Sequence, residues 1–184
     1  MAKPDGLGGV RLTPPTAIAA GQTFTVAAAG DVAGRGNAHQ ATAALLLDLL
    51  ATRKLTALLL LGDLQYPRGS LADFLADFDP SWGQPPLRRL ARPVPGNHEY
   101  DQGRSDADGY FDYWNGIDTA SGPAGLRGQG YYSFDMGDWH FVALNTSDEC
   151  RKIKCTPGSA MHDWLLRDLR ATTKRCVLAY FHHP

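Results

Sequence analysis

The chain has 184 residues, a length typical of one domain, and 43% of them are hydrophobic, enough to bury a sizeable core. Lysine and arginine total 18 against 19 aspartate and glutamate residues, without blocks of like charge, which argues against a nucleic-acid partner. No apolar run approaches the ~20 residues of a membrane-spanning helix. We therefore expect a small-molecule partner and no membrane segment.

The first 22 residues are rich in glycine and proline and show no hydrophobic period. This composition predicts a tail or linker over residues 1–22, with the domain spanning residues 23–184. The same segment lacks the apolar stretch of a signal peptide, so the sequence assigns no localisation.

Three units that each end in a polar loop follow in order. The apolar runs 23–29 and 55–61 are predicted to be buried strands, and they end in Gly30-Asp31 and Gly62-Asp63. A third run, 91–95, ends in Gly96-Asn97-His98-Glu99. Between these runs, apolar residues recur at helical spacing, which predicts helices that connect the strands. We therefore expect a largely parallel sheet whose loops converge at the carboxyl ends of the strands.

The second half of the chain adds other elements. The aromatic cluster 110–114 has helical spacing and predicts a short helix packed on the core, and the segments on either side of residues 136–138 predict an antiparallel hairpin. Ser159 is expected to cap a helix whose apolar stripe packs on a sheet. The last apolar run, 176–181, predicts a buried strand that delivers His182-His183-Pro184, and we expect the domain to be incomplete at this C-terminus.

The three cysteines bear on the compartment. Cys150 and Cys155 flank a short basic segment, and their spacing leaves a disulfide and a reduced pair equally open. Cys176 opens the last apolar run and is expected to be a buried thiol. A disulfide would favour an extracellular location.

Polar side chains capable of binding metal occur at four predicted strand ends. They are Asp31, Asp63, Asn97 with His98, and His182. Each alone is commonly a turn former, a cap or a structural histidine. Carboxylates brought together without cations would raise one another's pKa and destabilise the fold, so the convergent set predicts bound metal.

In this order, the motifs resemble those of the calcineurin-like metallophosphoesterase superfamily, and specifically its purple acid phosphatase branch. The resemblance rests on Gly30-Asp31, Gly62-Asp63-Leu64-Gln65-Tyr66, Gly96-Asn97-His98-Glu99 and His182-His183-Pro184, with further similarity from Tyr132 to Asn145. It implies an α/β fold, a two-sheet sandwich flanked by helices, with a dinuclear metal site at the strand ends.

The resemblance also implies roles for the metal ligands. Asp63 would bridge two metals, while Asp31 and Tyr66 would bind the first ion, which is Fe(III) in purple acid phosphatases. Asn97 and His182 would bind the second, a divalent ion of iron, zinc or manganese.

Two neighbouring residues would act without binding metal. His98 would be catalytic, either holding a phosphoryl oxygen or protonating the departing alkoxide, and Glu99 would orient His98 or a ligand. His39, His140 and His162 match no ligand motif and are expected to be structural or exposed.

The expected reaction is the hydrolysis of phosphate monoesters by a hydroxide that two metal ions activate. A phosphodiesterase or pyrophosphatase with the same site, and a non-catalytic binding domain, are the alternatives. The family supplies two further histidine ligands from a Gly-His-any-His motif, which these 184 residues do not contain. We therefore expect this chain alone to be impaired.

Overall fold

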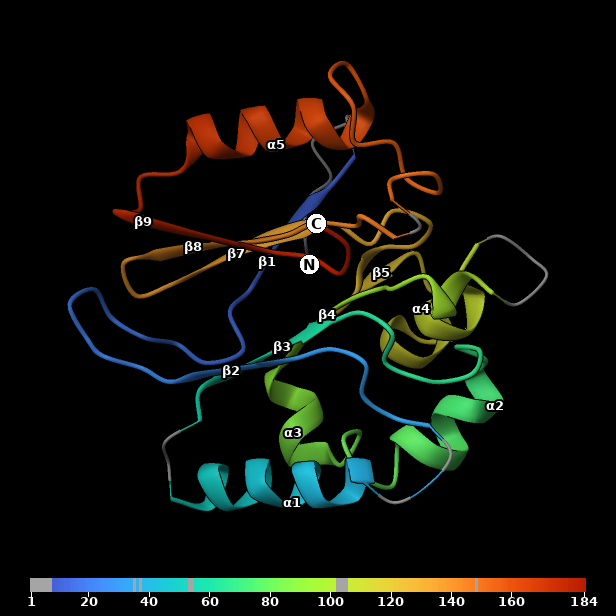
Figure 1. Cartoon of the computed structure of the whole chain (residues 1–184). Helices are drawn as coiled ribbons and strands as arrows, with labels where there is room; N and C mark the ends of the chain where they lie inside the picture. Colours follow the sequence, from blue (N-terminus) through green and yellow to red (C-terminus); the bar gives the residue numbers. More distant parts are fainter. Residues whose placement is uncertain (1–7, 35, 37, 53–54, 102–105, 148) are drawn as a thin grey trace.

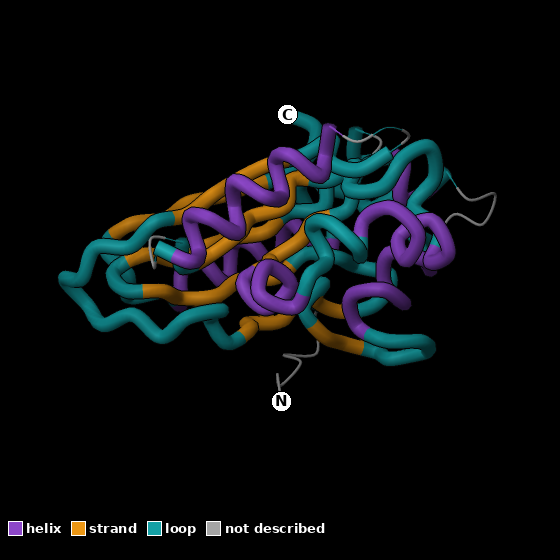
Figure 2. The backbone as a smooth tube through the Cα atoms, turned by 90° about the horizontal axis from the view of Figure 1, so that it is seen from below, coloured by secondary structure: helices purple, strands orange, loops and turns teal. Residues whose placement is uncertain are grey.

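The computed structural model describes residues 8–34, 36, 38–52, 55–101, 106–147 and 149–184. Two sheets stack face to face, and helices cover the outer face of each (Figure 1). In the view turned by 90°, a long helix runs along the direction of the strands (Figure 2). This mixed α/β architecture, with parallel and antiparallel pairing and flanking helices, agrees with the predicted two-sheet sandwich.

The first sheet consists of three parallel strands in the order β2-β3-β4. They are β2 (Val26–Ala29), β3 (Ala57–Leu61) and β4 (Ala91–Val94). On its outer side lie α1 (Ala38–Ala51) and α3 (Pro85–Leu90), with α2 (Leu71–Asp73), the π-helical turn η1 (Phe74–Phe78) and α4 (Asp108–Asn115) towards one end (Figure 1). The predicted aromatic helix is therefore confirmed, and its rings are buried in the core.

Strand β3 shows why a continuous apolar run is needed at the centre of the sandwich. Leu58 and Leu60 pack into the core beneath the helices, whereas Ala57 and Leu59 pack into the core between the two sheets. Successive side chains of a strand point to opposite faces, so a strand covered on both faces must be apolar at every position. Each buried leucine contributes about 2 kcal/mol of apolar burial.

The second sheet has the order β1-β7-β8-β9 and mixes directions. Its strands are β1 (Val10–Leu12), β7 (Tyr132–Met136), β8 (Trp139–Ala143) and β9 (Cys176–Tyr180). The β7–β8 pair is antiparallel, as the hairpin signal predicted, and β8–β9 is parallel. A small separate pair, β5 (Ser121–Gly122) with β6 (Gly125–Leu126), lies nearby.

Helix α5 (Ala160–Ala171) covers the outer face of this second sheet (Figure 1). The Ser159 side chain accepts the backbone N–H of His162, which confirms the predicted cap. Met161 and Trp164 of the helix pack with Tyr131 and Val142. Among the described residues, no helix is long and apolar enough to span a membrane.

The prediction that residues 1–22 form a tail is wrong for residues 10–12. This segment is strand β1, which pairs in parallel with β7, and Val10 is only 3% exposed. Three residues are too few to show a period, and the pairing partner lies more than 100 residues away along the chain. Residues 1–7 are outside the described part.

Two expectations about the end of the chain also need correction. Strand β9 is not buried on both faces: its residues alternate, with Val177 47% exposed and Tyr180 5% exposed. Leu178 and Tyr180 pack between the two sheets, whereas Val177 and Ala179 lie on the outer face, which the described residues leave uncovered at this strand. Cys176 is accordingly half-buried rather than buried, and Cys150 and Cys155 form a disulfide.

Candidate active site

The loops that follow β2 and β3 run side by side at the carboxyl edge of the first sheet. The backbone N–H of Asp31 donates to Gly62 O at 3.1 Å, and that of Val32 donates to Asp63 O at 3.0 Å. Asp31 and Asp63 both have left-handed backbone, with φ of 55° and 49°. Aspartate is one of the few residues besides glycine that adopts this region readily. The same uncommon conformation at equivalent positions of two loops turns both carboxylates towards the same edge of the sheet.

One phenol joins the two carboxylates. The Tyr66 O–H lies 2.6 Å from Asp31 Oδ1 and 2.9 Å from Asp63 Oδ2. Burial raises the pKa of the Tyr66 phenol well above its ordinary value, and both carboxylates raise it further because they accept its hydrogen bond. The phenol is therefore protonated in the metal-free protein.

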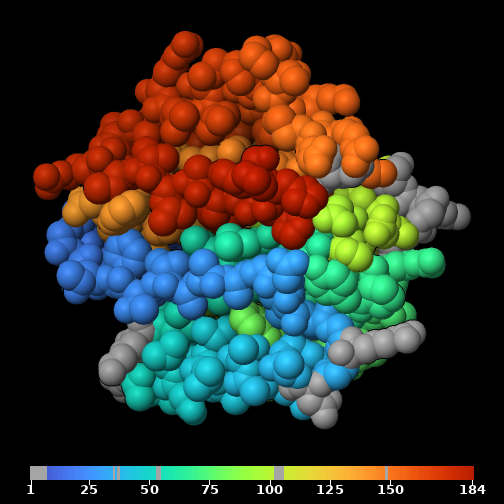
Figure 3. All heavy atoms as spheres, viewed as in Figure 1, coloured from blue at the N-terminus to red at the C-terminus, as the bar shows by residue number. Residues whose placement is uncertain are grey.

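His182 reaches the same place from the second sheet. Its Nδ1 donates to Leu61 O at 2.8 Å, so Nε2 is the atom that faces Asp63 Oδ1 at 3.4 Å. Gly62 makes this approach possible, because a Cβ at that position would lie 2.7 Å from the His182 Cβ. In the space-filling view, the C-terminal residues (red) lie directly against the blue and green segments of the first sheet (Figure 3).

His98 lies on the turn that follows β4, the 3-10 helix η2 (His98–Tyr100). Its backbone N–H donates to Asp63 Oδ1 at 2.9 Å, and its Nδ1 donates to Pro67 O at 2.7 Å. The opposite ring nitrogen, Nε2, lies 3.8 Å from Asp63 Oδ2. The ring also packs on Tyr66, with the ring centroids 4.3 Å apart.

These side chains surround one open cavity of ≈ 450 Å³. Its lining residues come from both sheets: Gly30, Asp31, Leu61, Asp63, Asn97, His98, Phe181, His182 and His183. The structure thus brings together Asp31, Asp63, Asn97, His98 and His182, and Tyr66 joins them through its two hydrogen bonds. His39, His140 and His162 do not line this cavity.

Glu99 is fully buried, and its carboxylate forms hydrogen bonds with backbone N–H groups rather than with the His98 ring. Its carboxylate accepts the N–H groups of Asp63 at 2.9 Å, Leu64 at 2.8 Å, Gln65 at 3.2 Å and Gly96 at 2.7 Å. Burial raises the pKa of Glu99 to about 7, although the N–H groups of Gly96, Gln65 and Leu64 oppose that shift. This single side chain therefore ties the loop after β3 to the loop after β4.

The charges of the site are coupled. Burial alone would raise the pKa of Asp63, but the His182 contact and the His98 backbone N–H outweigh it and lower the pKa. Burial alone would lower the pKa of His182, but Asp63 outweighs it and raises the pKa. The metal-free site therefore favours a carboxylate and an imidazolium in contact.

The donor set suits hard cations. It contains two carboxylates, a phenol, an amide and an imidazole whose Nδ1 is already bonded, which leaves Nε2 for a metal. Within the described part of the chain, no three histidine, cysteine, aspartate or glutamate side chains are grouped closely enough to hold an ion. The phenol and the amide are the further oxygen donors that lie beside the carboxylates and the imidazole.

Sequence reasoning left one lining residue without a role. The resemblance gives a ligand role to His182 and none to His183, yet both residues line the cavity and their ring centroids are 4.4 Å apart. The adjacent pair of histidines was the available signal.

The chain is thus an α/β two-sheet sandwich with oxygen and nitrogen donors gathered at its strand ends. The model of the calcineurin-like phosphoesterase family, Metallophos, matches residues 24–184, and the chain belongs to this family. The comparison with curated proteins found no significant match. The protein is therefore, in general terms, a metal-dependent phosphoesterase, of a family that generally binds two metal ions.

Proposed function

We propose that the protein hydrolyses phosphate monoesters in the manner of purple acid phosphatases. The observation that carries this proposal is the position of the Tyr66 hydroxyl, whose single proton lies within hydrogen-bonding reach of both Asp31 and Asp63, at the ends of two neighbouring strands, and Asp63 in turn contacts His182. A phenol placed between two carboxylates supplies hard oxygen donors for a trivalent ion once its proton is lost.

The proposed ligand set follows from this arrangement. Asp63 would bridge two ions, Asp31 and Tyr66 would bind Fe(III), and Asn97 and His182 would bind divalent iron, zinc or manganese. When bound, two such ions supply an activated water near neutral pH and neutralise charge that develops at phosphorus.

The remaining work falls to His98. Because Nδ1 donates to Pro67 O, Nε2 is the nitrogen available beside Asp63. When protonated, this atom would donate a hydrogen bond to a phosphoryl oxygen or give its proton to the departing alkoxide. Glu99 supports the reaction indirectly, since it fixes the backbone from which the Asp63 side chain projects.

Asp63→Asn tests the hydrolytic site. The change keeps the shape of the side chain and removes its charge, so we expect loss of bound metal and at least a ~100-fold fall in kcat/KM for p-nitrophenyl phosphate, since two-metal chemistry depends on the bridging carboxylate. Asp163→Asn, on the exposed face of α5, is the matched control and should match the wild type. Hydrolysis unchanged in Asp63→Asn, or a wild type that binds no metal at saturating concentrations, contradicts the proposal.

The assignment of iron has its own test. A tyrosinate on Fe(III) gives a visible charge-transfer absorption, which we expect in the wild type and not in Tyr66→Phe. If a colourless, iron-free protein still hydrolyses the ester, the assignment of ferric iron is wrong, but the assignment of hydrolase activity stands. Faster hydrolysis of a phosphodiester or of pyrophosphate would reject the monoester class.

We also propose an extracellular location, because the Cys150–Cys155 disulfide is of a kind that persists in an oxidising environment.

A further inference from the structure

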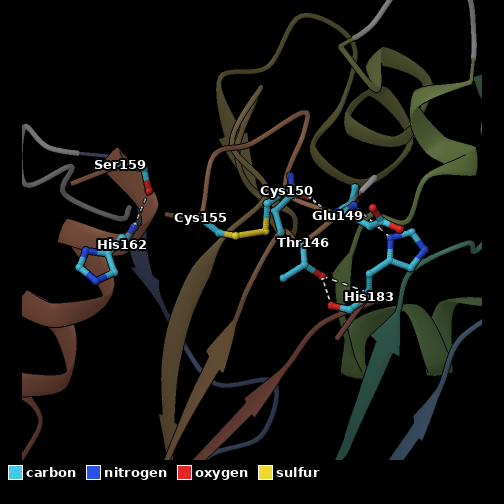
Figure 4. Close-up of a disulfide and its surroundings, with 9 residues drawn as sticks. Thr146, Glu149, Cys150, Cys155, Ser159, His162 and His183 are labelled. Atoms are coloured by element: carbon cyan, nitrogen blue, oxygen red, sulfur yellow. Dashed lines mark hydrogen bonds between the residues drawn. A yellow bond between two sulfur atoms is a disulfide. The ribbon is translucent and has the colours of Figure 1, made fainter. Parts of the chain in front are cut away.

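One loop beside the cavity forms hydrogen bonds with His183, near the end of the chain. This disulfide loop consists of residues 146–147 and 149–155, as far as it is described, and Figure 4 shows it against His183. The Thr146 hydroxyl donates to His183 O at 2.7 Å and accepts the His183 backbone N–H at 3.0 Å. A single hydroxyl therefore satisfies both backbone polar groups of His183.

The loop also holds the His183 ring. Glu149 and Cys150 both have left-handed backbone, with φ of 52° and 62°, a conformation costly for residues of these types. The disulfide from Cys150 to Cys155 and the Cys150 N–H bond to Thr146 O, at 3.2 Å, keep the turn in this shape. In this turn the Glu149 N–H lies 3.4 Å from His183 Nδ1 (Figure 4).

This contact fixes the tautomer of the ring. Because Nδ1 accepts the Glu149 N–H, the proton of a neutral His183 ring is on Nε2. The ring lies on the wall of the cavity that holds Asp31, Asp63 and His98, and it packs on His182 with centroids 4.4 Å apart. With this tautomer, His183 offers an Nε2–H donor to the cavity that it lines.

We propose that His183 is a substrate-binding residue that donates its Nε2–H to an oxygen of the phosphate ester, and that Thr146 and the disulfide loop position it. The proposal rests on the proposed function, since it requires a phosphate ester in this cavity. A charge-assisted hydrogen bond of this kind changes affinity by roughly 10- to 100-fold.

His183→Phe is the first test, because it keeps a ring of similar shape and removes the donor. We measure inorganic phosphate affinity by calorimetry, KM and kcat for p-nitrophenyl phosphate, and metal content, all at saturating iron and zinc. The phosphate Kd and KM should rise about tenfold or more, with metal content unchanged. His162→Phe is the matched control: His162 Nδ1 also lies 3.4 Å from a backbone N–H group, that of Gly158, but away from the cavity, and this change should have no effect.

Thr146→Val and Thr146→Ser test the positioning. The valine variant loses the hydroxyl and should raise the phosphate Kd in the same direction as His183→Phe, whereas the serine variant keeps the hydroxyl and should restore the wild-type value. Replacing Cys150 and Cys155 together by serine should act like the valine variant. NMR of the imidazole nitrogens should find the Nε2–H tautomer of His183 in the wild type and in Thr146→Ser, and lose it in Thr146→Val.

The outcomes separate the two proposals. If the wild type hydrolyses the ester and His183→Phe leaves the phosphate Kd and the KM unchanged, the role of His183 is overturned and the proposed function stands. If the protein hydrolyses no monoester but its phosphate affinity still depends on His183, the binding role of His183 stands and the proposed phosphatase function is rejected. Metal lost together with phosphate affinity in His183→Phe, or no phosphate bound by the wild type, overturns the inference.

Discussion

At the scale of single residues, the acid of the Gly96-Asn97-His98-Glu99 motif does its work on the backbone. A carboxylate that accepts four N–H groups, from Asp63, Leu64, Gln65 and Gly96, fixes the conformation of both loops that carry candidate ligands. Because the group is fully buried, no water replaces these bonds when they are lost. Glu99 is thus a positioning residue for Asp63.

Glu99→Gln should be strongly destabilising. The amide NH₂ replaces one acceptor oxygen and faces two backbone donors, so buried N–H groups lose their partner, at a cost of about 2–4 kcal/mol. Urea denaturation measures this change. The matched control is Glu149→Gln, at the exposed glutamate, which should stay within about 0.5 kcal/mol of the wild type. Equal stability of the two variants would show that the four bonds contribute little.

At the scale of secondary-structure elements, β1, β7, β8 and α5 meet at one aspartate. Asp168 of α5 accepts from Arg11 of β1 and Ser133 of β7, each at 3.0 Å, and lies 2.7 Å from Nε2 of His140 on β8. Nδ1 of the buried His140 lies 2.7 Å from Asp135. This network explains how a three-residue strand is held in the sheet, and why His140 is structural and takes no part in the cavity.

Asp168→Ala should loosen this corner of the second sheet. The change leaves Nε2 of the buried His140 and the Ser133 hydroxyl without their acceptor, although Nδ1 of His140 keeps Asp135, and such a loss typically costs about 3 kcal/mol or more. Asp163→Ala, at a 52% exposed side chain of the same helix, should cost less than about 0.5 kcal/mol. Thermal or urea unfolding compares the two. A small effect at Asp168 would mean that β1 and α5 are held by apolar packing alone.

At the scale of the whole molecule, the site exists only because two sheets meet. Asp31, Asp63 and His98 come from loops of the first sheet, whereas His182 and His183 follow β9 of the second. The junction is tight at Gly62, whose φ is 85° and where an added Cβ would lie 2.7 Å from His182. Small changes at this glycine therefore alter the distance between the two halves of the ligand set.

Gly62→Ala should separate these halves. Gly21→Ala is the matched control, because Gly21 also has positive φ, 78°, but an added Cβ there meets nothing within 4 Å. Both variants should lose about 1–2 kcal/mol of stability through backbone strain. Only Gly62→Ala should also weaken metal binding, by tenfold or more, because the added methyl displaces His182. Metal titration of both variants measures this, and equal affinities would contradict the account.

Local patterns accounted for most of the elements. The apolar run of β3, the β7–β8 hairpin, the Ser159 cap and the aromatic helix α4 each follow from neighbours within a few residues. The sequence also placed polar side chains at the strand ends, and these ends do converge on one cavity. Strand β1 could not be predicted, because its stability comes from β7 and Asp168, each more than 100 residues away.

By itself, the sequence determined which residue types stand at which strand ends, since periodicity and turn chemistry act over a few residues. Only the tertiary structure decided what those side chains contact. Glu99 bonds to the backbone of Asp63, and the rings of His98 and His182 each bond to a distant carbonyl group. The Thr146 hydroxyl likewise bonds to the backbone of His183. All of these contacts join residues that come together only when the chain folds. Such contacts depend on where distant backbone groups come to lie, and no local pattern encodes that position.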